Sequence, residues 1–154
     1  MINRILAKYI DLIFDKFLFY VILYMLNKKK NIIITNNPKI LEEISDKNIE
    51  ISYFEQADFM EISYKARDFI HLGYKLLTHP IVSSIKPYET PYKTIVLAYN
   101  NGEIDLESIE LIENSIELLK NFLDKPRRKL TKNIDEDFKL IDYKLISEAI
   151  ESIA

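Results

Sequence analysis

The chain contains no cysteine and no tryptophan, and it has only two histidines and two glycines among its 154 residues. Without cysteine it can form no disulfide, no thiolate nucleophile and no cysteine-based metal site. His71 and His79 do not form a metal-binding pattern with any other ligand. Two glycines, Gly73 and Gly102, are too few for the dinucleotide-binding fingerprint or the P-loop, both of which place several glycines against phosphate. We therefore expect no metal site and no cofactor.

The overall composition is that of a folded globular chain. Apolar residues make up 48% of the sequence, and the length fits one domain with a core of its own. A net charge of -3 gives no electrostatic attraction to nucleic acid, so we expect no nucleic-acid partner.

The first 29 residues differ from the rest. Residues 17–26 (FLFYVILYML) form an unbroken apolar run that a basic stretch, residues 28–30, follows. Ten residues are too few to span a bilayer, which needs about 20. Three interpretations stay open: an apolar helix packed on the domain or on a partner, an interfacial membrane anchor, or untranslated leader with the native start at Met25. We expect membrane contact only if residues 1–26 are genuine and exposed.

Strand-like and helix-like segments alternate over residues 30–123. Short β-branched runs predict strands at 31–35, 49–54, 74–78 and 94–99, and helices are predicted after the first, second and fourth of these strands. Alternation of this kind predicts βαβ units. The expected fold is α/β: a small, mostly parallel sheet of about four strands, flanked by helices on both faces. An N-terminal apolar helix (1–29) would precede this domain, and a basic linker (124–133) would connect it to a C-terminal helix (134–154).

A long polar crossing, residues 76–93 (LLTHPIVSSIKPYETPYK), separates the last two predicted strands. Loops of this length inside compact domains are usually functional or disordered, and the interleaved Pro, Tyr and Ile argue against disorder. Ligands of open α/β sheets bind beyond the carboxyl ends of the strands, and a helix N-terminus favours an anion. The predicted ligand-binding residues are those after the first and third strands and in the crossing: Thr35, Asn36, Asn37, Thr78, His79, Ser83, Ser84, Lys86, Glu89, Thr90, Tyr92 and Lys93.

Each of these residues also has a purely structural explanation. The asparagines can simply cap a helix, Lys86 and Glu89 can stabilise the loop, and His79 can be a loop histidine bonded to backbone. His79 is nevertheless the best catalytic candidate, because its unperturbed pKa lies near neutrality. Ser83 or Ser84 with His79 and Glu89 would supply the residue types of a nucleophilic set, but sequence proximity is not geometry. An enzyme is therefore the less favoured interpretation.

Two segments, IIITNNP at residues 32–38 and KLLTHPIVSSIKPYETPYKTIVL at residues 75–97, resemble the GrdX family. Its members are small proteins encoded alongside the selenoprotein glycine, sarcosine and betaine reductases of amino-acid-fermenting anaerobes. The resemblance covers residues 30–123 and also favours a start at Met25. It implies a cytoplasmic accessory protein whose partners are reductase components, and it implies no reaction. The alternative function is a small enzyme or ligand-binding protein for an anionic metabolite, a carboxylate or a phosphate, at the strand edge.

Overall fold

The computed structural model describes residues 30–45, 48–81, 86–122, 124–126 and 129–152. The elements in order are β1 (Asn31–Thr35), α2 (Pro38–Glu43), β2 (Ile49–Tyr53), α3 (Phe59–His71), β3 (Tyr74–Leu76), β4 (Thr94–Tyr99), α4 (Leu106–Lys120) and α5 (Lys132–Glu151). The predicted N-terminal helix with Met25, the two serines Ser83 and Ser84, and the two arginines of the basic linker, Arg127 and Arg128, lie outside the described residues.

The four strands form one sheet in the order β2-β1-β4-β3. Only β1 and β2 are parallel, and β4 is antiparallel to both of its neighbours. The prediction of a mostly parallel sheet was therefore wrong. Helix α2 carries the chain from β1 back to the start of a parallel β2, whereas no helix is described between β3 and β4. The chain simply turns back along the crossing, which is the connection that an antiparallel pair permits.

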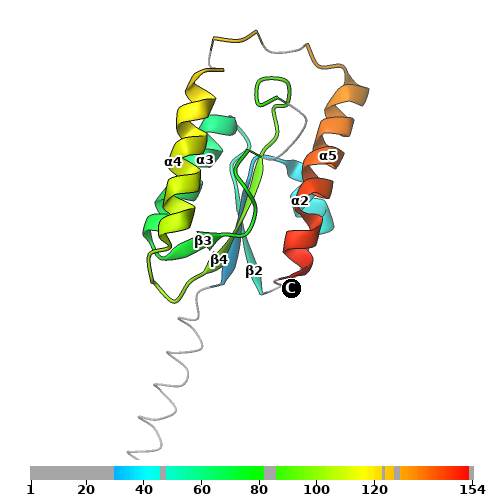
Figure 1. Ribbon diagram of the computed structural model, residues 1–154. Coiled ribbons are helices and arrows are strands. Elements are labelled where there is room, and N and C mark those ends of the chain that lie inside the picture. The colour runs from blue at the N-terminus through cyan, green and yellow to red at the C-terminus, as the bar shows by residue number, and fades with distance from the viewer. Residues whose placement is uncertain (1–29, 46–47, 82–85, 123, 127–128, 153–154) are drawn as a thin grey trace, which may run out of the picture.

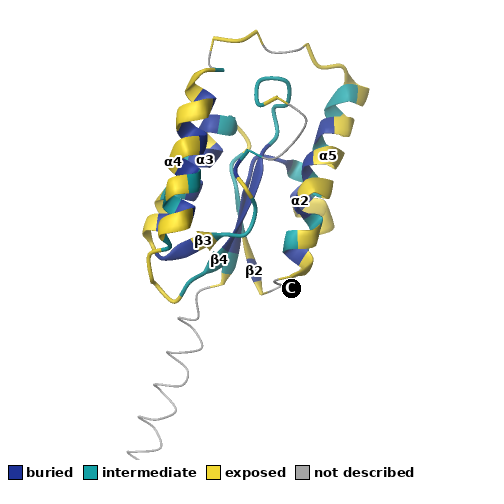
Figure 2. Ribbon diagram, in the orientation of Figure 1, coloured by how far each residue is buried: buried dark blue, intermediate teal, exposed yellow. Residues whose placement is uncertain are grey.

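Helices cover both faces of this sheet, as predicted. Helices α3 and α4 lie on one face, and α2 and α5 lie on the other (Figure 1). Successive β1 residues point to opposite faces, so Ile32 and Ile34 pack with α3 and α4 whereas Ile33 packs with α2 and α5. Figure 2 shows the buried strands between outer helix faces that are exposed. Because β1 is buried on both faces of the sheet, its sequence is a continuous apolar run.

Local signals in the sequence set the two ends of α3. Asp58 and Glu61 form a complete capping box at its start. Gly73 follows the C-cap with a φ of +87°, and a Cβ atom there would lie 2.3 Å from the Cα of Gly102. The turn after β4 thus packs against the end of α3 so closely that only glycine fits at position 73.

Helix α5 begins two residues earlier than predicted, because Thr131 accepts a hydrogen bond from Ile134 N as its N-cap. The predicted apolar face of this helix (Phe138, Ile141, Leu145, Ala149 and Ile150) was partly wrong. The buried stripe is Phe138, Asp142, Ile146 and Ile150, and Leu145 is 48% exposed. These residues are spaced four apart, so they lie on one face of α5, and this face packs against the sheet. Within the described residues, no helix is both long and apolar enough to cross a membrane.

Candidate functional site

Hydrogen-bonded polar side chains gather where β1 ends and β4 begins. The hydroxyl oxygens of Thr35 and Thr94 lie 2.6 Å apart. The carboxylate of Asp142 accepts from the backbone N–H of Thr94 at 3.0 Å and from its hydroxyl at 2.6 Å. Since the Thr94 hydroxyl donates to Asp142, the Thr35 hydroxyl donates to Thr94. We refer to Thr35, Asn36, Asn37, Thr94 and Asp142, all of them buried, as the edge cluster.

Asn36 connects β1 to two loops. Its side-chain NH2 donates to the carbonyl oxygens of Ala57 and Pro91, at 2.7 Å each. Its side-chain oxygen accepts from the backbone N–H of Lys93, also at 2.7 Å. Both side-chain donors of Asn36 are therefore engaged by protein carbonyls, and no N–H of this side chain is left for a ligand.

Asn37 joins the start of α2 to α5. Its side-chain oxygen caps α2 by accepting from Lys39 N. Its NH2 group donates to the carbonyl oxygen of Lys139 and to the carboxylate of Asp142, at 2.9 Å each. The N-terminus of α2, which we considered as an anion site, is therefore already capped by the side-chain oxygen of Asn37. The buried carboxylate of Asp142 lies beside it.

A second set of bonds fastens the crossing to α5. The hydroxyl of Tyr92 donates to Asp135 at 2.8 Å, and Lys139 bridges Asp135 and Glu136 at 2.8 Å each. Burial, with the hydrogen bond to Asp135, raises the pKa of Tyr92 to about 12. The neighbouring Thr90 accepts from the backbone N–H of Tyr92. These contacts order the end of the crossing against the helix.

The other predicted site residues are spread along the crossing. The side-chain oxygen of Thr78 accepts a hydrogen bond from the backbone N–H of Val96 at 3.0 Å, in place of a backbone carbonyl just after β3. His79 is exposed, and its Nδ1 accepts from the backbone N–H of Ile81, which is the structural alternative that we considered for it. Lys86 is exposed beside the ring of Tyr88, and Glu89 N bonds to Lys86 O in a turn. The ligand-binding roles of these residues stay predictions.

Lys93 is the predicted site residue with the most unusual environment. Its side chain is only 7% exposed, and its Nζ lies 5.2 Å from the centre of the Phe59 ring. Burial lowers the pKa of Lys93 to about 8, and the charge of Asp142 opposes this shift.

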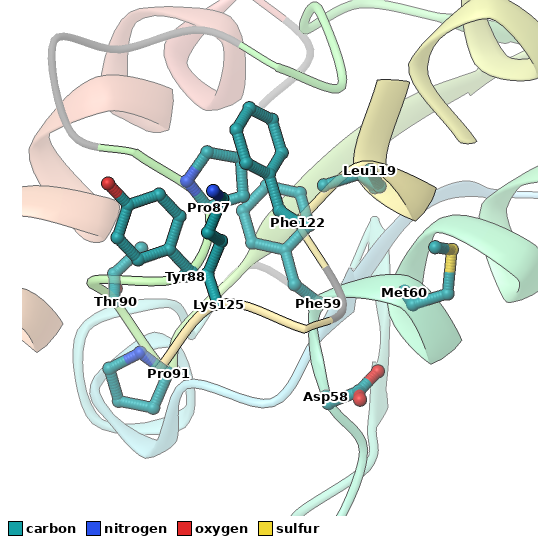
Figure 3. A pocket seen from close by; sticks show the side chains of 10 residues that line it. All are labelled: Asp58, Phe59, Met60, Pro87, Tyr88, Thr90, Pro91, Leu119, Phe122 and Lys125. Atoms are coloured by element: carbon teal, nitrogen blue, oxygen red, sulfur yellow. The ribbon is translucent and has the colours of Figure 1, made fainter. Parts of the chain in front are cut away.

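Hollows lie beside the described residues of the crossing. The hollow in Figure 3, about 70 Å³, lies between Pro87 and Tyr88 of the crossing, the start of α3 and the aromatic ring of Phe122 beyond α4. A smaller one, about 30 Å³, and a larger one, about 360 Å³, share the walls formed by Lys93, Asp142 and Leu145. Within the described part of the chain, no group of three or more potential ligands could hold a metal ion.

Asp142 is the residue that the sequence analysis missed. It lies in a helix whose apolar residues we assigned to a different stripe, so we had no reason to expect it in the interior. One signal was present: an acid placed four residues after Phe138 and four before Ile146 shares their helix face. An acid in that position is either exposed or bonded to buried donors, and here it is bonded.

Comparison with known protein families gives a match over most of the chain. The family model of the GrdX-like protein matches residues 32–151, which include every described strand and helix except the first residue of β1. The chain belongs to the GrdX-like family. The match also extends beyond residue 123, where the resemblance stopped, and includes α5 of this GrdX-like protein. A search of the curated proteins and a search of the solved structures find no match.

Proposed function

We propose that this GrdX-like protein works by binding, as a cytoplasmic accessory protein of the glycine reductase system. The observation that carries the proposal is the closed edge cluster, since its carboxylate, amides and hydroxyls bond to one another and to backbone. Catalytic groups must be able to reach a substrate. The hydrogen bonds of the edge cluster are instead formed within the protein, and they hold α2, α5 and the crossing in place.

The proposed partners are components of glycine, sarcosine or betaine reductase, as the family implies. The Nδ1 of His79, the best catalytic candidate, accepts a hydrogen bond from the backbone, and this side chain is exposed. These features support a binding role more than a catalytic one.

Purified components test the proposal directly. The full chain, mixed with separately purified reductase components, should co-elute with one of them in size-exclusion chromatography at a fixed stoichiometry. Lys93→Met serves as a matched control, because the side chain is buried and should not alter an outer binding surface. If no component shifts the elution of the wild-type chain, the accessory function is wrong.

A further inference from the structure

Lys93 is a largely buried lysine, only 7% exposed. In the described residues its Nζ donates no hydrogen bond and forms no ion pair, and it lies over the Phe59 ring. Every fully buried side-chain nitrogen or oxygen of these residues has a hydrogen-bond partner, so the Nζ of Lys93 keeps some exposed surface. Removing most of an ammonium group from water with no counter-ion in contact is unfavourable, and a cation–π contact offsets only part of this cost.

The Lys93 side chain lies in the wall of a cavity that a small molecule could occupy. The larger hollow, about 360 Å³, is lined by Lys93 and Asp142 together with apolar side chains that include Leu77 and Ile146. This volume lies in the range of small-molecule sites, about 300–1,000 Å³. The walls of the cavity thus combine this amine with apolar side chains and with the polar side chains of Thr78, His79 and Glu148.

The charges around the cavity restrict what could bind. Asp142 and Glu148 contribute carboxylates to the same walls. Asp142 interacts electrostatically with Lys93 but makes no contact with it within 4 Å, since no ion pair joins them. A ligand with net negative charge would be repelled by the carboxylates, and a cation would be repelled by Lys93. A neutral polar molecule fits this pair of charges best.

We propose that Lys93 is a reactive amine that holds a small neutral aldehyde or ketone in this cavity as a reversible imine. Desolvated lysines form such adducts because a larger fraction of the amine is unprotonated. The Nζ lone pair attacks the carbonyl carbon, and the C=O π electrons move to oxygen. One proton moves from the nitrogen to this oxygen and gives the carbinolamine. A second proton moves from the nitrogen to the hydroxyl, which leaves as water as the C=N bond forms.

This step is balanced without an oxidant or a reductant, because one water is released for each imine. When the imine is protonated its positive charge remains within the electrostatic reach of Asp142, as that of the free ammonium does. The proposal does not depend on the accessory function. A reductase partner would bind on an outer surface, whereas the imine forms at Lys93 in the hollow beside α5.

Reductive trapping tests the proposal on the full-length protein. Propanal with sodium cyanoborohydride at about pH 7.5 should alkylate Lys93 at least about tenfold more than the exposed Lys86. With a pKa of about 8, roughly a quarter of the Lys93 amine is neutral at this pH. The neutral fraction of Lys86 is far smaller, because its interaction with Tyr88 raises the pKa of Lys86 above its ordinary value. Peptide mass mapping measures both sites. In Lys93→Met the preferential adduct should disappear, while circular dichroism and co-elution with a reductase component should not change.

Two results would overturn the proposal. Equal or lower labelling of Lys93 relative to Lys86 in the folded protein would show that the amine is not reactive. Preferential trapping of glyoxylate, an anionic aldehyde, over propanal would show that Lys93 recognises negative charge. The ligand would then be an anion and not a neutral carbonyl compound. Labelling in denaturant, which should equalise the two lysines, controls for reagent access.

Discussion

The edge cluster should contribute a large share of the stability of this fold, and Asp142→Ala tests this. The substitution removes the acceptor of three hydrogen bonds, two from Thr94 and one from Asn37. A hydrogen bond to a charged group contributes about 1.5–3 kcal/mol. The three share one carboxylate and do not add fully, and water from the adjoining cavity can reach part of the cluster. We therefore expect a loss of about 3–5 kcal/mol, the range for a buried charge network that loses one member.

Urea unfolding followed by circular dichroism measures this loss as a lower midpoint at an unchanged slope. The melting temperature should fall by roughly 10 °C, because each kcal/mol shifts it by about 2–4 °C in a chain of this size. Glu148→Ala is the matched control: it removes an exposed acid from the same helix and should change stability by less than about 0.5 kcal/mol. A loss below about 1 kcal/mol for Asp142→Ala would refute the structural role of the cluster.

Four further predictions follow from the same contacts. Asn36→Ala should cost about 2–4 kcal/mol in urea unfolding, because it leaves two partly buried carbonyls and the buried Lys93 N–H without their partner. Ile112→Ala, at a fully buried site of α4, should cost about 2–5 kcal/mol by the same measurement. His79→Ala and Lys86→Ala, at exposed positions, should each shift the melting temperature by less than about 2 °C in differential scanning fluorimetry. The pKa of Lys93 falls from 10.5 to about 8 on folding, so the unfolded state binds more protons between these values. The unfolding midpoint of wild type relative to Lys93→Met should therefore rise with pH from about 8 to 10, and a flat difference would contradict the burial of this amine.

The sequence predicted most elements because their signals are local. The capping box at Asp58 and Glu61, the glycine at position 73 and the β-branched run of β1 each depend on residues close in the chain. The predicted direction of β4 was wrong because it depends on the path of the long crossing. No residue pattern within residues 76–93 predicts that path. Alternation of strands with helices favours parallel sheets in general, but here no helix is described in the connection between β3 and β4.

The edge cluster was predicted in part. Thr35, Asn36 and Asn37 follow a strand, and strand ends are where polar groups of α/β proteins meet, so the sequence indicated the right edge. It could not show that Asn36 and Asn37 use their donors on carbonyls of distant loops and helices, since those contacts span 21 to 105 residues. Asp142 was missed for the same reason.

The most direct test of the binding function is affinity purification of the tagged full-length protein from a glycine-fermenting host, with quantitative mass spectrometry of the eluate. We predict that a glycine, sarcosine or betaine reductase component co-elutes at a fixed stoichiometry, with wild type and with Lys93→Met alike. Elution of the chain alone, while the reductase components stay in the flow-through, would contradict the accessory function.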